Sequence, residues 1–206
     1  MINKKKKRYE ELVNELTDKE LLLSLLLTNI LALVVALVLG LFLFDSFAEF
    51  RNIFDWTDKR IFTVGVAAGI GVFLLDLLLM KLFPLSYFDD GGVNKRIFQN
   101  RTVWQIFLIS LSVAVSEEIL FRGVIQTKFG LIIASVIFAL VHYRYLFNPF
   151  LFINVILLSF FIGFIYLLTG NLLVTIMMHF VIDFFLGITY RIKFGRQDPL
   201  PAGEER

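Results

Sequence analysis

Seven ionisable side chains inside long apolar stretches of this 206-residue chain are candidates for chemistry. They are Asp76, Glu117, Glu118, Arg122, His142, His179 and Asp183, and they include both histidines of the chain. If these stretches cross a membrane, each charge costs about 2.5–3.5 kcal/mol on insertion scales, so each needs a partner or a function. Carboxylates and imidazoles are also the side chains that most often activate water as general bases. These seven residues are therefore the candidates for the chemistry of the protein.

Helical spacing divides the seven residues into pairs. Glu118 and Arg122 are four residues apart, so they share one helix face and can neutralise each other. Glu117 is rotated by about 100° from Glu118 and does not share that partner. The spacing of four also relates His179 to Asp183. We therefore expect one glutamate to be structural and the other to be free for chemistry.

Composition places the chain in a membrane. Hydrophobic residues make up 58% of it and charged residues 18%, and the mean hydropathy is +0.78. An ordinary soluble domain has about 45–50% apolar and about 25% charged residues. The net charge of +2 gives no reason to expect a nucleic-acid partner. The absence of cysteine excludes disulfides, thiolate metal sites and thiol nucleophiles.

Six apolar runs approach the roughly 20 residues that span a bilayer, so we predict an all-α, polytopic transmembrane bundle. The runs are Leu21 to Phe44, Ile61 to Phe83, Val103 to Ile125, Gly130 to Phe147, Phe150 to Leu168 and Leu172 to Tyr190. The breaks at 126–129, 148–149 and 169–171 are short, which indicates tightly packed antiparallel helices. We divide the chain into an N-terminal part with two helices (1–102), a core (103–190) and a polar tail (191–206).

Lysine and arginine predict the orientation, because cytoplasmic segments collect them. With six helices both termini share one side, and most of the Lys and Arg residues fall there, so we expect both termini in the cytoplasm. The basic run Lys4 to Arg8 precedes a segment with helical spacing, Tyr9 to Leu16. This segment either lies on anionic lipid at the inner membrane face or remains a solvated positive-inside signal.

Depth along the helices brings three of the candidates together. At about 1.5 Å per residue, Glu117 lies about 15 Å, His142 about 18 Å and His179 about 12 Å from the same side of the membrane. The third, fourth and sixth helices can therefore join these side chains in one buried cluster. Asp76 lies in the second helix, outside this set, where it pairs with Lys81 or extends its carboxylate toward the headgroups.

Three kinds of site fit such a cluster. In the first, Glu117 and His142 act as a base pair that activates water, while His179 and Asp183 stabilise an oxyanion. In the second, the same four groups bind a divalent metal such as zinc or manganese, although no HExxH motif is present. In the third, the charges form a buried network that only fixes helix packing.

Three motifs in the core resemble a known family. Residues 117–122 (EEILFR) resemble an EExxxR motif, residues 138–142 (FALVH) an FxxxH motif, and residues 179–183 (HFVID) an HxxxN/D motif. All three occur in this order in the CPBP intramembrane proteases, which include CAAX prenyl endopeptidases and bacterial Abi bacteriocin-immunity proteins. The resemblance covers about residues 103–190.

The resemblance implies a role for each motif residue. Glu117 and His142 activate the water that attacks the peptide carbonyl, and His179 and Asp183 stabilise the oxyanion. Glu118 and Arg122 form an orienting ion pair, and Phe138 packs beside His142. The CAAX endopeptidases usually carry Asn at the position of Asp183. An ionised Asp183 would repel an oxyanion, so it is protonated, holds His179 in its cationic form or binds a metal.

These roles imply a metal-independent intramembrane endopeptidase of the bacterial plasma membrane that requires no cofactor. Its substrates would be peptides or membrane-anchored proteins, such as peptide pheromones, leader peptides or bacteriocin precursors. Two other functions use the same residues. One is a non-catalytic bacteriocin self-immunity or scaffold protein of the same fold. The other is a small proton-linked transporter, for which the sequence shows no inverted repeat.

Overall fold

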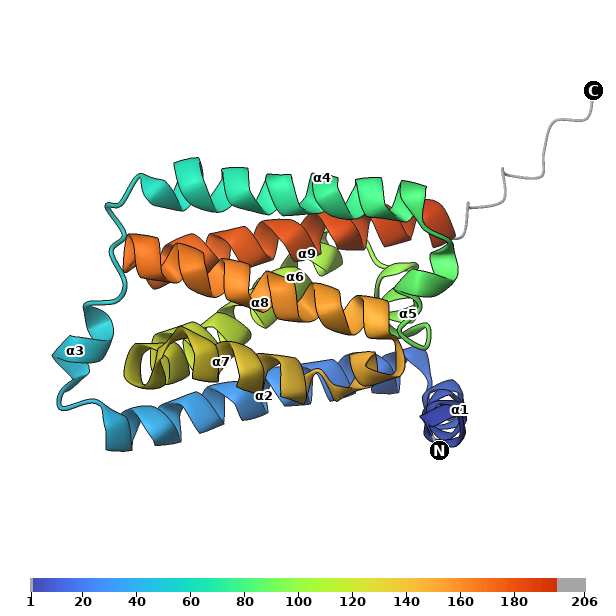
Figure 1. Cartoon of the computed structure of the whole chain (residues 1–206), viewed down its shortest axis with the longest axis horizontal. Helices are drawn as coiled ribbons and strands as arrows, with labels where there is room; N and C mark the ends of the chain where they lie inside the picture. The colour runs from blue at the N-terminus through green and yellow to red at the C-terminus, as the bar shows by residue number, and fades with distance from the viewer. Residues whose placement is uncertain (1, 196–206) are drawn as a thin grey trace, which may run out of the picture.

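The computed structural model describes the backbone of residues 2–195, and their side chains except those of residues 2–6, 10 and 85. The described chain is helical (Figure 1). Its longer helices are α1 (Ile2–Glu15), α2 (Asp18–Leu43), α4 (Ala67–Leu82), α6 (Val103–Glu118), α7 (Thr127–Val141), α8 (Pro149–Thr169) and α9 (Leu172–Phe194). The shorter segments are α3 (Phe47–Arg51), η1 (Ile61–Val66), η2 (Leu85–Phe88), α5 (Val93–Phe98), η3 (Ile119–Gln126) and η4 (Tyr143–Phe147).

Five helical segments in the described part of the chain are long and apolar enough to cross a membrane, which confirms the polytopic bundle. They are Asp18–Leu43, Ile61–Leu82, Val103–Val141, Pro149–Thr169 and Leu172–Phe194. The third segment contains two of the predicted helices, because Gly130 has φ 84° and ψ 170° and interrupts the helix. Glu117 and His142 lie on opposite sides of Gly130 in sequence and their side chains meet, so the chain reverses there.

Two predicted boundaries in this region are wrong. Residues 126–129 do not form a break, since the helix continues through the π-helical segment η3 to the turn at Gly130. Gln126 is buried in η3, and its Nε2 atom donates to the carbonyl oxygen of Gly163 at 2.7 Å. The predicted helix Gly130 to Phe147 ends at Val141 and continues as the 3-10 turn η4. His142 therefore occupies the end of α7 rather than its interior.

The other short breaks follow the prediction, and side chains explain them. Asn148 caps α8 by accepting from the backbone N–H of Leu151, and Pro149 takes the first helical position, where no amide hydrogen is needed. Gly170 ends α8 with φ 62°, a conformation that glycine adopts without steric cost. Asn171 then caps α9.

Helix α9 lies at the centre of the bundle, with α4, α5, α6 and α8 packed around it. Glycine allows η1 and α4 to approach it closely. A Cβ atom built on Gly65 would lie 2.8 Å from the carbonyl oxygen of Val174, and one on Gly69 would lie 2.8 Å from that of Met178. Helix α2 packs on α6 and η3, so the N-terminal helices and the core share one bundle.

Helix α1 and the C-terminal end of α9 lie at the same end of the bundle, opposite α3 (Figure 1). Figure 1 also shows α1 nearly along its own axis, so it runs across the long helices. Of the predicted polar tail, residues 196–206 lie outside the described residues. The cytoplasmic location of this end stays a prediction.

Polar contacts hold together the opposite end of the bundle, where α8 turns into α9. Arg60 donates to the carbonyl oxygen of Thr169 at 2.9 Å and pairs with Asp58 at 2.9 Å. The Nδ2 atom of Asn171 donates to the carbonyl oxygen of Asp55 at 2.8 Å. Hydrogen bonds from Arg60 lower the pKa of Asp58 to about 2. These contacts link the loop before η1 to the α8–α9 turn.

Candidate active site

The predicted cluster assembles from three helices. Glu117 and Glu118 are the last residues of α6, His142 directly follows α7, and His179 and Asp183 lie one turn apart on α9. Because the chain reverses at Gly130, α7 runs back along α6 and brings His142 to the level of Glu117.

Glu117 lies between the two imidazoles. Its Oε1 atom is 3.8 Å from Nε2 of His142, and its Oε2 atom is 4.0 Å from Nε2 of His179. The side chains of Glu117 and His142 are 20% and 18% exposed, whereas that of His179 is 6% exposed. Both separations are longer than a direct hydrogen bond.

The FxxxH motif orients His142. Its Nδ1 atom lies 2.8 Å from the backbone carbonyl oxygen of Phe138, a contact in which the ring nitrogen donates, because the carbonyl can only accept. Neutral His142 therefore presents the acceptor nitrogen Nε2 to Glu117. The buried ring of Phe138 stacks on the imidazole, with the ring centroids 4.4 Å apart, which agrees with the packing role expected for Phe138.

Glu118 joins two motifs. Its Oε2 atom is 3.6 Å from Nε of Arg122, so the ion pair expected from the spacing is present. Its Oε1 atom accepts from Nδ1 of His179 at 2.9 Å. The side chains of Glu118 and Arg122 are fully buried. The contact with His179 was not predicted, because spacing within one helix carries no information about partners on another.

Two further residues of this network were also missed. Arg122 donates to the hydroxyl of Ser159 at 2.9 Å and to Oε1 of Gln126 at 3.3 Å. Ser159 is a buried polar residue inside the apolar helix α8, and Gly163 follows it by one turn. A small hydroxyl one turn from a glycine marks a close helix contact, and that signal is visible in the sequence.

Asp183 and Asp76 differ in their relation to the cluster. An oxygen of Asp183 is 3.6 Å from Nε2 of His179, and its side chain is 28% exposed. Asp76 is partly buried on α4, and no ion pair joins it to another described side chain, Lys81 included.

The distances also bear on the metal alternative. Among the side chains that the structure describes, no group of three or more His, Asp or Glu residues has the arrangement that holds a metal ion. His179 is nevertheless held through Nδ1 by a carboxylate, as metal-binding histidines often are. The donor set therefore contains ligand types that suit a divalent metal.

A second polar group, also absent from the predictions, surrounds the turn after His142. The guanidinium of Arg144 donates to the hydroxyl of Tyr145 at 2.7 Å and lies 3.9 Å from the carboxylate of Asp90. The ring of Tyr145 lies parallel to the imidazole of His142, with centroids 5.9 Å apart and 8° between the planes. Burial raises the pKa of Asp90. This group connects η4 to the loop before α5.

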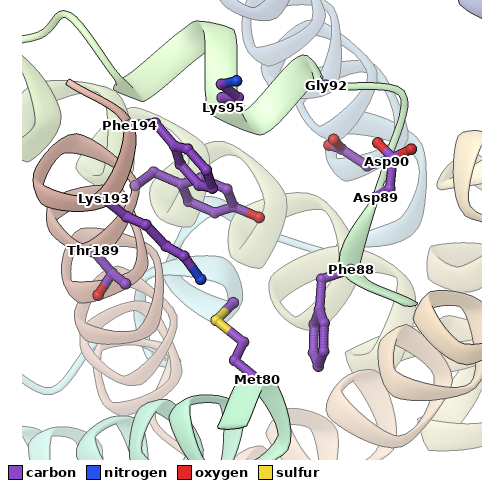
Figure 2. A pocket seen from close by; sticks show the side chains of 10 residues that line it. Met80, Phe88, Asp89, Asp90, Gly92, Lys95, Thr189, Lys193 and Phe194 are labelled. Atoms are coloured by element: carbon purple, nitrogen blue, oxygen red, sulfur yellow. The ribbon is translucent and has the colours of Figure 1, made fainter. Parts of the chain in front are cut away.

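A cavity of about 130 Å³ is lined in part by Asp90. It lies where the ends of α4 and α9 meet the loop before α5. Figure 2 shows Met80, Phe88, Lys193 and Phe194 around it. None of the four candidate catalytic residues lines it. It is therefore separate from the cluster and lies at the end of the bundle that carries α1.

Comparisons with known proteins agree with this architecture. Residues 99–185 match the family of type II CAAX prenyl endopeptidase Rce1-like proteins. The chain is 43% identical over 159 residues to the uncharacterized protein YpbD of Bacillus subtilis (strain 168), covering 77% of this chain and 84% of YpbD. It is 29% identical over 152 residues to the UPF0177 protein YxdF of Lactococcus lactis subsp. lactis (strain IL1403), covering 67% and 81% respectively. No solved structure matches the chain.

The fold and the cluster define a polytopic membrane protein with carboxylates and imidazoles gathered inside its helical bundle. The chain belongs to the Rce1-like family of type II CAAX prenyl endopeptidases, and the matched segment contains all three motifs. The family resemblance predicted from those motifs is confirmed.

Proposed function

We propose that the protein is an intramembrane endopeptidase that hydrolyses membrane-associated or small peptides. In this proposal Glu117 and His142 activate the attacking water. His179 and Asp183 stabilise the charge that develops on the carbonyl oxygen, and no metal takes part.

One observation carries the proposal: two hydrogen-bond acceptors face each other. The Nδ1–H of His142 is engaged by Phe138, so Nε2 presents a lone pair to the carboxylate of Glu117, 3.8 Å away. Two acceptors at this distance cannot bond to each other, whereas one water molecule can donate to both. Its oxygen lone pair then remains free to attack a carbonyl carbon.

His179 supplies the complementary charge. Carboxylate oxygens of Glu118, Asp183 and Glu117 lie 2.9, 3.6 and 4.0 Å from its ring nitrogens. Their attraction stabilises positive charge on the imidazole, and its Nε2–H can donate to a developing oxyanion. Asp183 lies 3.6 Å from the same Nε2 atom, so in this proposal an ionised Asp183 stabilises the imidazolium of His179 and a peptide carbonyl oxygen displaces it from Nε2.

The proposed reaction balances without a cofactor. The water oxygen bonds to the peptide carbonyl carbon, and the proton it loses passes to Glu117. When the carbon–nitrogen bond breaks, this proton passes to the leaving amine. The products are a carboxylic acid and an amine.

The test compares cells that carry the wild-type protein with cells that carry Glu117→Ala or the exposed control Asp45→Ala. The termini of membrane and secreted peptides are sequenced in each. We expect a set of termini that Asp45→Ala preserves and Glu117→Ala abolishes. Identical termini in all three strains, with equal amounts of protein in the membrane, would contradict the proposal and favour the self-immunity or scaffold alternative.

A chelator distinguishes the two chemical forms of the proposal. Cleavage that persists after prolonged treatment with EDTA and 1,10-phenanthroline is expected for water activated by Glu117 and His142. Loss of cleavage that added zinc restores would assign the four groups to a metal instead.

A further inference from the structure

Helix α1 packs one stripe of its surface on the bundle. Val13 is buried among Leu21, Val93 and Ile97, and Tyr9 is half-buried one turn earlier. The adjoining stripe is open, because Leu12 is 54% and Leu16 38% exposed. An exposed apolar stripe beside basic residues is the pattern of helices that lie in the interface of a membrane.

Arg96 of α5 fixes the end of α1 to the bundle. Its guanidinium donates to the carbonyl oxygen of Val13 at 2.8 Å and to that of Leu16, and it pairs with Asp18 at 2.8 Å. These carbonyl groups lie at the end of α1, where the amide four residues further on is missing, and Val13 accepts only a long bond of 3.3 Å from the N–H of Leu16. Helix α1 is therefore held across the end of the bundle, as Figure 1 shows.

Tyr9 connects α1 to η4, the turn that follows His142. Its ring lies edge-on to Tyr143 at 6.5 Å between centroids and 5.8 Å from the ring of Phe147. It also closes over Gly91, where an added Cβ would come within 3.1 Å of the Tyr9 ring. Tyr143 directly follows His142 in the chain. Through Tyr9, helix α1 thus contacts both η4 and the loop that carries Asp90.

The basic residues of α1 indicate what binds its exposed apolar stripe. Residues 4–8 read KKKKR, and Lys7 and Arg8 are exposed. The end of the bundle where α1 lies is where the long helices would leave a membrane. Each basic residue near an anionic leaflet contributes roughly a fivefold gain in binding. A phospholipid surface offers both the apolar layer that suits Leu12 and Leu16 and the phosphates that suit the cations.

We propose that α1 binds an anionic phospholipid surface and thereby holds η4, and with it His142, in the orientation seen here. This proposal concerns the positioning of the site and does not depend on which bond the protein cleaves. Tyr9 is the positioning residue in this coupling.

The experiment measures hydrogen–deuterium exchange of the full-length protein in nanodiscs of phosphatidylcholine alone or with about 30 mol% phosphatidylglycerol. We expect residues 7–16 and 143–147 to exchange roughly tenfold more slowly in the anionic nanodiscs. Equal exchange in both lipids for either segment would overturn the proposal, whether or not the protein is a protease.

Two sets of variants sharpen this measurement. The triple change Lys6→Gln, Lys7→Gln and Arg8→Gln should remove the lipid effect on both segments. A matched triple change of exposed cations at the same end, Lys81→Gln, Arg191→Gln and Lys193→Gln, should retain it. If both triples lose the effect equally, α1 is not the lipid-binding element and the proposal fails.

The coupling is tested at Tyr9. Tyr9→Ala should leave the lipid effect on residues 7–16 and abolish it at 143–147, whereas Tyr9→Phe, which keeps the ring, should preserve both. An undiminished lipid effect at 143–147 in Tyr9→Ala would overturn the coupling. Thermal unfolding of each variant in detergent checks that the bundle itself is intact.

Discussion

Nδ1 of His142 and the backbone carbonyl oxygen of Phe138 lie 2.8 Å apart, one helical turn from each other at the end of α7. This contact fixes which nitrogen of the imidazole carries the proton and turns Nε2 toward Glu117. Because the acceptor is a backbone carbonyl of α7, the contact depends on where α7 ends.

The first prediction concerns His142 itself. His142→Ala removes the acceptor that holds the water opposite Glu117, so peptide hydrolysis should fall roughly 10²–10⁴-fold, the range that general-base catalysis contributes. The imidazole also stacks on the ring of Phe138, with centroids 4.4 Å apart, so the variant should unfold at a somewhat lower temperature in detergent, and its hydrolysis is compared on protein that is still folded. Hydrolysis at the wild-type rate by the folded variant would exclude His142 from the reaction.

The second prediction concerns the buried ion pair. Glu118→Ala leaves Arg122 without its carboxylate in the bundle interior, which should cost about 3–5 kcal/mol in free energy of unfolding. The matched control is Lys128→Ala, which breaks the partly exposed pair of Lys128 and Glu49 and should cost at most about 1 kcal/mol. Chemical unfolding in detergent measures both. Equal losses would contradict the structural role of Glu118.

The third prediction tests the contact of η3 with α8. A Cβ atom on Gly163 would clash with the side chain of Leu131 and lie 2.8 Å from Oε1 of Gln126, so Gly163→Ala should destabilise the protein by about 1–3 kcal/mol. A Cβ on Gly71 would meet nothing within 4 Å. Gly71→Ala should therefore be neutral or mildly stabilising. Unfolding measurements that rank the two variants the other way would contradict this packing.

The fourth prediction is a pH dependence at the α8–α9 turn. The pKa of Asp58 is lowered to about 2 in the folded protein, so its stabilising contribution is complete above the unfolded pKa of about 3.9. That contribution should disappear as the pH falls from about 4 to about 2. Asp58→Asn should be less stable than wild type at neutral pH, and the difference should narrow across this window. A difference that does not narrow would contradict the lowered pKa.

Helical periodicity was sufficient to find most of the cluster. Residues four apart share a face wherever a helix is regular, so the pair of Glu118 and Arg122 was predictable, as were the common faces of the other two motifs. The depth estimate from rise per residue also placed Glu117, His142 and His179 together. These inferences use geometry within one helix and counts from its ends.

Contacts between helices were not predictable in the same way. The hydrogen bond of Glu118 to His179 depends on how α9 is rotated against α6, and hydrophobicity alone does not set that rotation. The turn at Gly130 was misplaced by a few residues, because the polar residues at 126–129 resemble a loop in composition. In the structure Gln126 is instead buried, since Gly163 offers it a backbone acceptor. Asp90 and Arg144 were missed because they meet across two loops.

Glu117 is the residue that we propose to activate the attacking water. The most direct measurement is the rate at which purified protein in proteoliposomes cleaves a peptide whose new terminus depends on the protein in cells, compared between wild type and Glu117→Gln. The amide keeps the size of the side chain and removes its basicity. We expect a loss of roughly 10²–10⁴-fold in rate with unchanged thermal unfolding. A folded Glu117→Gln protein that cleaves the same peptide at the wild-type rate would contradict it.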